Sequence, residues 1–226
     1  MDVEYNFKFE NDTGFSFKVD DSFFQRASEL EDAVWTDLDY CQCSNCPLNK
    51  EDSPKCPVAL GLYQLVEKVS NSLSFESAKV TVQTTQRAYY KETDLQSGLF
   101  SLMGYIMAQS DCPHFKFLRP LAKYHLPFSS IEETIFRTAG SHLLNQHMND
   151  LEGYDFDYSL DGLRENYNKL EIVNKGISER IHNLTKGDAG KNAIICLNIF
   201  AQMFDAQFDN DFTIIEKIFS EDEKHD

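Results

Sequence analysis

Four of the six cysteines of this 226-residue chain lie close together, at positions 41, 43, 46 and 56. Thiolates bind soft and borderline metals, and tetrahedral zinc takes four ligands of this kind. The C-x2-C pair, Cys43 and Cys46, occupies a stretch short enough for a tight turn to aim both sulfurs at one ion. A metal bound here would tie the N-terminal part of the chain to the rest of the fold.

Two residues are candidates for the fourth metal ligand, Cys41 and Cys112. Cys41 would close the site locally, whereas Cys112 would bring in the end of a predicted helix. Cys46, Cys56 and Cys112 are each followed by proline, which stiffens the chain beside a ligand, and Cys41 is not. The pattern favours Cys43, Cys46, Cys56 and Cys112 as ligands, with Cys41 as the alternative.

The metal itself has alternatives. Zinc fits four thiolates, but iron–sulfur clusters also take four cysteines and also use Cys-Pro motifs. A metal-free interpretation makes Cys43 and Cys46 a redox pair or leaves all the thiols unliganded. Cys196 lies in the apolar stretch AIICLNIF and is expected to be a core residue.

The charge and hydropathy of the chain limit the cellular locations and the binding partners that we expect for the protein. The net charge of −16 argues against nucleic acid and against anionic membranes, because both require a basic surface. No apolar run approaches the roughly 20 residues of a membrane span, and the N-terminus lacks the pattern of a signal peptide. We therefore expect a cytoplasmic protein, in which clustered cysteines favour metal or redox chemistry over disulfides.

The second candidate site is the basic stretch that follows Cys112, which contains no acidic residue up to position 131. His125 could act as a general base or metal ligand, Arg119 and Arg137 could hold an anion, and Glu133 could orient them. In the structural alternative these side chains satisfy loop backbone groups and carboxylates. No nucleophile, P-loop, dinucleotide or zinc-protease motif accompanies them.

The predicted fold class is α+β. Alternating apolar residues in 5–9 and 15–19, separated by the turn sequence ENDTG, predict an antiparallel β-hairpin. A second β segment near 78–91 extends it to a small sheet of three or four strands. The remainder predicts a predominantly helical bundle, joined to the hairpin by the Cys-rich metal loop at 36–57.

Helix boundaries follow from proline and capping patterns. Pro57 suits the first position of a helix, and capping boxes are predicted at Thr93 with Gln96 and at Ser130 with Glu133. Arg119, which precedes a proline, is expected to be extended. Three further helices are predicted at 159–184, 188–208 and 212–220.

The helix at 159–184 has an apolar seam with strict three-four spacing and Asn174 within it. Such a seam packs inside a bundle or pairs two chains as a coiled coil, so a homodimer through residues 160–184 is the alternative. We predict one domain, 1–220, made of a hairpin region at 1–35, the loop and the mostly helical 58–220. Residues 152–162 are expected to form a surface loop and 221–226 an acidic tail.

Several stretches resemble an uncharacterised bacterial protein family, a domain of unknown function: CSNCPL, KCPVA, LQSGLFSLMGYIMAQSDCP and LRPLAKYHLPFSSIEETIFR. The resemblance covers nearly the whole chain. It implies family positions at Cys43, Cys46, Cys56, Cys112, Arg119, His125, Pro127, Glu133, Thr134 and Arg137, and it omits Cys41. The chain departs from the family at Lys123 and Tyr124, where the pattern has arginine and phenylalanine. The resemblance implies no reaction.

Together these features predict a cytoplasmic protein with a structural zinc site that acts as a regulatory, interaction or ligand-binding module. Its partner would be another protein or a small anionic ligand. The alternative is an iron–sulfur redox protein, or a metal-assisted enzyme that uses the His/Arg segment 114–137. A non-catalytic module is favoured over an enzyme.

Overall fold

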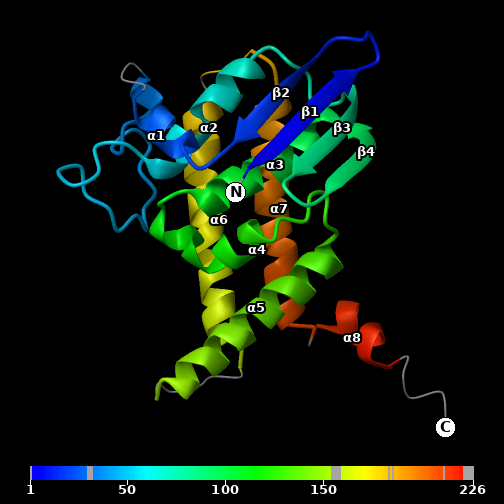
Figure 1. The fold of residues 1–226 in the computed structure, drawn as a ribbon. Coiled ribbons are helices and arrows are strands. Elements are labelled where there is room, and N and C mark those ends of the chain that lie inside the picture. Colours follow the sequence, from blue (N-terminus) through cyan, green and yellow to red (C-terminus); the bar gives the residue numbers. More distant parts are fainter. Residues whose placement is uncertain are drawn as a thin grey trace.

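The N-terminal part of the chain forms a four-stranded antiparallel sheet, as predicted, and most of the remainder is helical (Figure 1). The computed structural model describes residues 2–29, 33–153, 159–182, 184, 186–210 and 212–220. The predicted acidic tail and the middle of the predicted loop at 152–162 lie outside these residues. The fold class is therefore α+β.

The sheet has the strand order β2-β1-β3-β4, with every neighbouring pair antiparallel. Its strands are β1 (Val3–Phe9), β2 (Gly14–Val19), β3 (Ser77–Thr84) and β4 (Ala88–Asp94). Alternate residues of β1 and β3 are buried, which is the period of a strand with one covered face. Gly98 lies under this face, because a Cβ there would come within 2.5 Å of the Phe7 ring. The sheet therefore packs directly on the helix that contains Gly98.

The helices are α1 (Phe23–Ser28), α2 (Pro57–Lys68), α3 (Leu95–Gln109), α4 (Arg119–Lys123), α5 (Ile131–Leu151), α6 (Asp161–His182), α7 (Ala189–Phe208) and α8 (Thr213–Ser220). Two 3₁₀ helices, η1 (Val34–Thr36) and η2 (Pro113–Leu118), complete them. Pro57 starts α2 and the Ser130–Glu133 capping box starts α5, both as predicted. Among the described helices, none combines the length and apolar character needed to cross a bilayer.

Helices α6 and α7 lie side by side and form the centre of the bundle, with α3 packed against α7 (Figure 1). The Tyr167 and Phe204 rings stack across α6 and α7, with centroids 3.8 Å apart. The predicted seam of α6 is buried within the chain itself at Leu163, Tyr167, Leu170, Asn174, Ile177 and Ile181. This is the bundle arrangement, in which the seam contacts the chain's own helices.

Two predicted boundaries were wrong. Asp94, and not Thr93, caps α3: its carboxylate accepts a hydrogen bond from the Ser97 backbone N–H, and Thr93 remains in β4. A carboxylate is a good N-cap because it also interacts favourably with the helix dipole. Arg119 is helical, with φ −54° and ψ −39°, because Pro120 occupies the first turn of α4 instead of following an extended residue.

Candidate metal centre and apolar cavity

Cys43 and Cys46 lie on one tight turn, in which the Cys46 N–H donates to the Cys43 carbonyl at 2.9 Å. Asn45, between them, binds this turn to two other elements. Its side-chain amide donates to the Lys169 carbonyl of α6, and its own carbonyl accepts from His114 Nε2 of η2 at 2.8 Å. The turn is thus fixed against α6 and η2, which are far from it in sequence.

Cys56 and Cys112 occupy equivalent places in two helices. Each is the extended N-cap residue, at α2 and η2 respectively, and each is followed by a proline in the first turn. Both are buried, and the Cys56 N–H donates to the Thr36 carbonyl at 2.7 Å. Proline at the first helical position fixes the backbone there, so the direction of the preceding thiol is fixed as well.

The thiols of Cys43, Cys46, Cys56 and Cys112 lie within electrostatic range of one another. Burial, with smaller contributions from the other three thiols, raises the pKa of Cys112 to about 12. Burial likewise raises the pKa of Cys43 to about 11, with Cys56 and Cys46 adding to the effect. Cys41 is exposed, has a positive φ of 47° and takes no part in these interactions.

All six cysteines are free. In the part of the chain that the structure describes, no three His, Cys, Asp or Glu side chains have the arrangement of a preformed metal site. Two of the four thiols are buried and two, those of Cys43 and Cys46, are half-buried, and their proximity favours the protonated forms because like charges repel in a poorly solvated site. A metal would replace those protons, since the thiolate is the ligand form.

A buried arginine adjoins the thiols. Arg180 of α6 is only 1% exposed and donates to three backbone carbonyls of the segment that leads into the cysteines, those of Trp35, Asp37 and Leu38. No carboxylate of the described residues lies within ion-pair distance of it. Its charge instead lowers the pKa of Cys43 against the larger effect of burial. A buried cation without a carboxylate partner favours thiolates beside it.

Gly176, one turn before Arg180 on α6, lets Cys43 approach the helix. A Cβ at this position would lie 2.7 Å from the Cys43 sulfur, closer than real Cβ contacts allow. The glycine costs helix stability on its own, by about 1 kcal/mol relative to alanine. Close approach of the sulfur is the structural reason for a glycine in the middle of this long helix.

The predicted His/Arg site is divided by the fold. Arg119 lies on the surface, where it pairs with Asp111 at 2.9 Å and reaches the Ser110 carbonyl. Glu133 closes the capping box of α5 with Ser130 and is exposed. Neither residue lines the cavity that His125 and Arg137 share, so the predicted grouping of four residues does not form there.

His125 and Arg137 do come together, at the wall of one cavity. Arg137 is half-buried and donates to the carbonyls of Leu121 and Tyr124, at 3.3 and 2.7 Å. Glu133 does not orient Arg137 through an ion pair, because Arg137 donates to these carbonyls instead. Glu133 still raises the pKa of Arg137, although burial lowers it by more.

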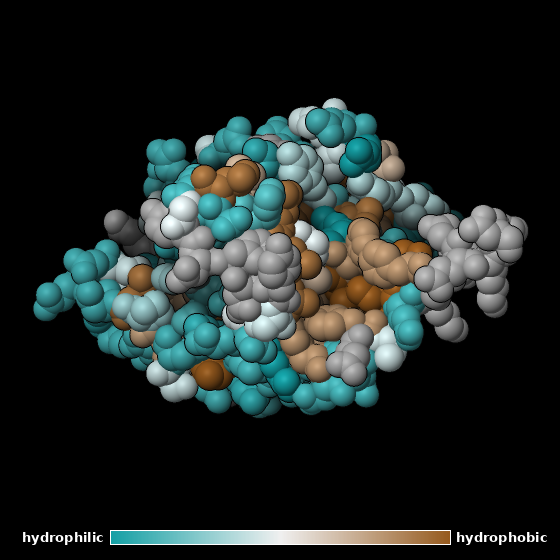
Figure 2. All heavy atoms as spheres, turned by 90° about the horizontal axis from the view of Figure 1, so that it is seen from below, coloured by the Kyte–Doolittle hydropathy of each residue, from teal (hydrophilic) through white to brown (hydrophobic). Residues whose placement is uncertain are grey.

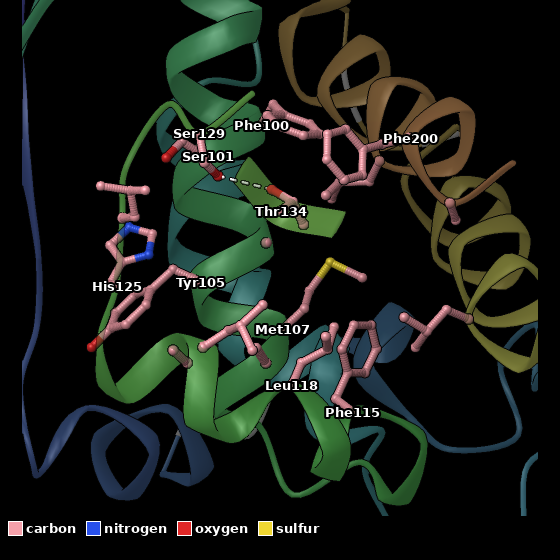
Figure 3. Close-up of a pocket in the computed structure, with 18 of the residues that line it drawn as sticks. Phe100, Ser101, Tyr105, Met107, Phe115, Leu118, His125, Ser129, Thr134 and Phe200 are labelled. Carbon is pink, nitrogen blue, oxygen red and sulfur yellow. Dashed lines mark hydrogen bonds between the residues drawn. The ribbon is translucent and has the colours of Figure 1, made fainter. Parts of the chain in front are cut away.

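The cavity has a volume of about 150 Å³ and lies between α3, the η2–α4 segment, α5, α6 and α7 (Figure 3). Its walls are mostly aromatic and aliphatic, with Phe100, Met107, Phe115, Leu118 and Phe200 among the lining side chains. The polar lining residues are Ser101, His125, Ser129, Thr134, Arg137 and Asn174. An apolar cavity with a few convergent polar groups is the usual form of a small-molecule site.

His125 is held by a short chain of hydrogen bonds. Its Nε2 lies 2.6 Å from the Tyr5 hydroxyl, which lies 2.8 Å from Ser101 Oγ, and Ser101 Oγ accepts from the Phe128 N–H. Burial, and secondarily the charge of Arg137, lowers the pKa of His125 to about 3. Burial also raises the pKa of the Tyr5 phenol, so the hydrogen bond between Tyr5 and His125 joins two neutral groups near neutral pH. A base this weak is a poor proton acceptor near neutral pH.

The depressed pKa of His125 makes stability depend on pH. The unfolded chain protonates this imidazole near pH 6.5 and the folded chain only near pH 3, so the unfolded state gains protons as the pH falls. The contribution of His125 to the free energy of unfolding is fully present above pH 6.5 and is lost progressively below it. Between pH 7 and pH 5 this loss amounts to about 2 kcal/mol. Urea unfolding of wild type and His125→Gln at both pH values should show the smaller decrease in the variant. His147→Gln, at an exposed position, is the control, and equal decreases in wild type and His125→Gln would contradict the prediction.

Sequence reasoning missed Arg180 and Gly176 and gave Asn174 a different role. A signal for Arg180 was present, since it follows Val173 and Ile177 at the spacing of one buried helical face. A charged residue on such a face must find partners inside the fold. For Gly176 no sequence signal identifies the sulfur that approaches it.

The fold and site define an α+β protein whose Cys-rich segment packs on a helical bundle that contains a partly open, mostly apolar cavity. The chain matches the family described as a domain of unknown function, DUF6901, over residues 3–220, and it belongs to that family. The resemblance expected from the sequence is thereby confirmed. No curated protein and no solved structure matches the chain.

Proposed function

We propose that this protein is a non-catalytic binding or regulatory module of the cytoplasm, in which Cys43, Cys46, Cys56 and Cys112 hold one structural zinc ion. The observation that carries the proposal is that four thiols from three separated segments of the chain lie close enough to shift one another's pKa. Zinc in structural sites is bound by four such ligands in a closed tetrahedron. Bound there, it would clamp the Cys-rich segment to α2 and η2.

The surroundings of the thiols support a thiolate–metal site. Four thiolates around Zn²⁺ carry a net negative charge, and the buried guanidinium of Arg180 supplies an opposite charge on α6. Cys41 lies outside the group, in keeping with the choice of Cys112 as fourth ligand. Six free cysteines suit a reducing compartment, which is the reason for placing the protein in the cytoplasm.

A structural role for the metal is favoured over a catalytic one. Four protein thiolates fill the coordination of zinc, whereas catalytic zinc keeps a position open for water or substrate. His114, the imidazole nearest in sequence to Cys112, is engaged with the Asn45 carbonyl. His125 lines the cavity instead, where its low pKa makes it a weak base.

Metal analysis of protein purified without oxygen tests the proposal. We expect one zinc ion per chain and no visible absorbance, because a filled zinc shell has no absorbing d–d transition. Iron with sulfide and a visible spectrum would instead establish the iron–sulfur alternative. Chain without stoichiometric metal, even after zinc is supplied to reduced protein, would contradict both.

A further inference from the structure

The cavity is large enough for one small ring. A cavity of about 150 Å³ with aliphatic and aromatic walls accommodates a molecule of the size of benzene. The cavity is partly open, so substituents on such a ring can extend toward the opening. The Phe100 and Phe200 rings lie at its wall with centroids 5.6 Å apart, and Figure 3 shows them on one side of it. Size and wall chemistry together specify a compact, largely apolar occupant.

Asn174 supplies an observation that points to a polar group on that occupant. Its side chain lines the cavity, is only 4% exposed and has no hydrogen-bond partner among the described residues. Asn174 is not among the described residues with a fully buried, unsatisfied polar atom, so its amide faces the space of the cavity, where water or a ligand can pair with it.

The only formal charge among the described lining residues is positive. Arg137 uses Nη2 for two backbone carbonyls, and no described carboxylate lies within ion-pair distance of its guanidinium. No aspartate or glutamate lines the cavity, although the chain carries a net charge of −16. Arginine matches the planar geometry of a carboxylate through paired N–H donors, and the mostly apolar surroundings strengthen that interaction.

We propose that the cavity binds a single-ring aromatic carboxylate, with the ring among the apolar walls, the carboxylate at Arg137 and a ring hydroxyl at Asn174. This inference rests on the binding role in the proposed function and names its ligand class. Thr134 and Ser129, whose hydroxyls lie 3.1 Å apart at the same wall, provide further donors for the anion. The neutral His125 beside them adds hydrogen-bonding capacity without a second charge.

Calorimetric titration of the metal-replete full chain with 4-hydroxybenzoate, benzoate and benzamide tests the ligand class directly. We expect one saturable site, the order 4-hydroxybenzoate, benzoate, benzamide, and a loss of about tenfold or more when the carboxylate is replaced by the amide. Equal affinity for benzoate and benzamide, or no saturable binding of any of the three, would overturn the proposal. This comparison needs no variant.

Four variants locate the site. Arg137→Gln should reduce the affinity for benzoate to that for benzamide. The matched control Arg119→Gln removes the same charge from the surface and should leave the affinities for benzoate and benzamide unchanged. Ala201→Leu, at a buried lining position, should abolish binding of all three probes by filling the cavity. Asn174→Leu should remove only the advantage of the hydroxyl. Benzoate affinity that falls equally in both arginine variants would assign the effect to overall charge.

The zinc content of each sample separates this inference from the proposed function. Stoichiometric zinc without binding of any probe would refute the ligand class and leave the metal site standing. Selective carboxylate binding by a chain that takes up no metal would refute the metal site and support the ligand class. Circular dichroism of Arg137→Gln shows whether the variant folds, and the probe series on wild type decides the ligand class if it does not.

Discussion

Cys112→Ser is expected to lose the zinc and to unfold far more easily than the wild type. Metal binding in structural sites contributes about 10–16 kcal/mol of apparent free energy, so removal of one ligand should lower the free energy of unfolding by at least about 4 kcal/mol. The expected effect connects distant parts of the sequence, because Cys112 is the proposed ligand from η2 and the other three proposed ligands lie at positions 43–56. Zinc content and urea unfolding measure the two consequences.

Cys41→Ser is the matched control for this experiment. Cys41 is exposed and has no electrostatic interaction with the buried thiols, so its variant should keep full zinc and nearly full stability. Zinc retained by Cys112→Ser and lost by Cys41→Ser would establish the local ligand set instead. If Cys112→Ser is insoluble, a chelator added to the wild type should lower Tm, and should lower it equally in Cys41→Ser.

Arg180→Met is expected to have the second largest effect, a loss of about 3–5 kcal/mol in the free energy of unfolding. The guanidinium satisfies the carbonyls of Trp35, Asp37 and Leu38, and methionine leaves all three without these donors. The buried charge beside the thiols is lost as well, so zinc affinity should fall. Arg180→Lys should give an intermediate result, because one ammonium cannot reproduce the fork geometry of arginine.

Arg164→Met provides a control on the same helix. Arg164 pairs with Asp205 and Asp209 in partly exposed positions, and solvent screening keeps the contribution of such ion pairs small. Its variant should unfold close to the wild type and keep its zinc affinity. Comparable losses in the free energy of unfolding of the two methionine variants, measured by urea unfolding, would contradict this prediction. They would show that the hydrogen bonds from Arg180 to the three carbonyls contribute no more than a surface ion pair.

Apolar side chains also gather in a hollow at the lower end of the molecule (Figure 2). Exposed apolar residues of α5, α7 and α8 include Phe136, Leu144, Met148, Leu151, Ile195, Ile199, Met203, Ile218 and Phe219. Exposed apolar surface of this extent marks interaction sites in many soluble proteins. It is separate from the seam of α6, which the bundle covers.

Local patterns predicted the elements because the causes are local. Alternation of apolar residues around a polar turn gave the β1–β2 hairpin, and in the structure Asp12 adopts the positive φ that such a turn needs. Ser130 with Glu133 gave the start of α5 because a capping box involves only neighbouring backbone groups. Thr93 with Gln96 has the same pattern and failed, because Asp94 competes for the same helix start and Thr93 is held by β3.

The grouping of functional side chains is where local patterns were insufficient. Arg119, His125, Glu133 and Arg137 lie close in sequence, yet only His125 and Arg137 share a wall of the cavity. Each arginine takes the nearest partners that burial and geometry allow, a surface carboxylate for Arg119 and inward carbonyls for Arg137. Which partner is near depends on how α4 and α5 pack, and that is set by distant parts of the chain.

The sequence by itself determined the α+β class, the hairpin, most helix positions and the four cysteines favoured as ligands, because periodicity, capping and Cys-Pro patterns are properties of short segments. Only the tertiary structure decided that α6 supplies a buried cation at Arg180 and close approach at Gly176 beside those thiols. It alone placed Asn174 at a cavity, in a seam that the spacing also allows to pair two chains. The physical reason is that burial and contact arise from the packing of segments more than a hundred residues apart, which no local pattern encodes.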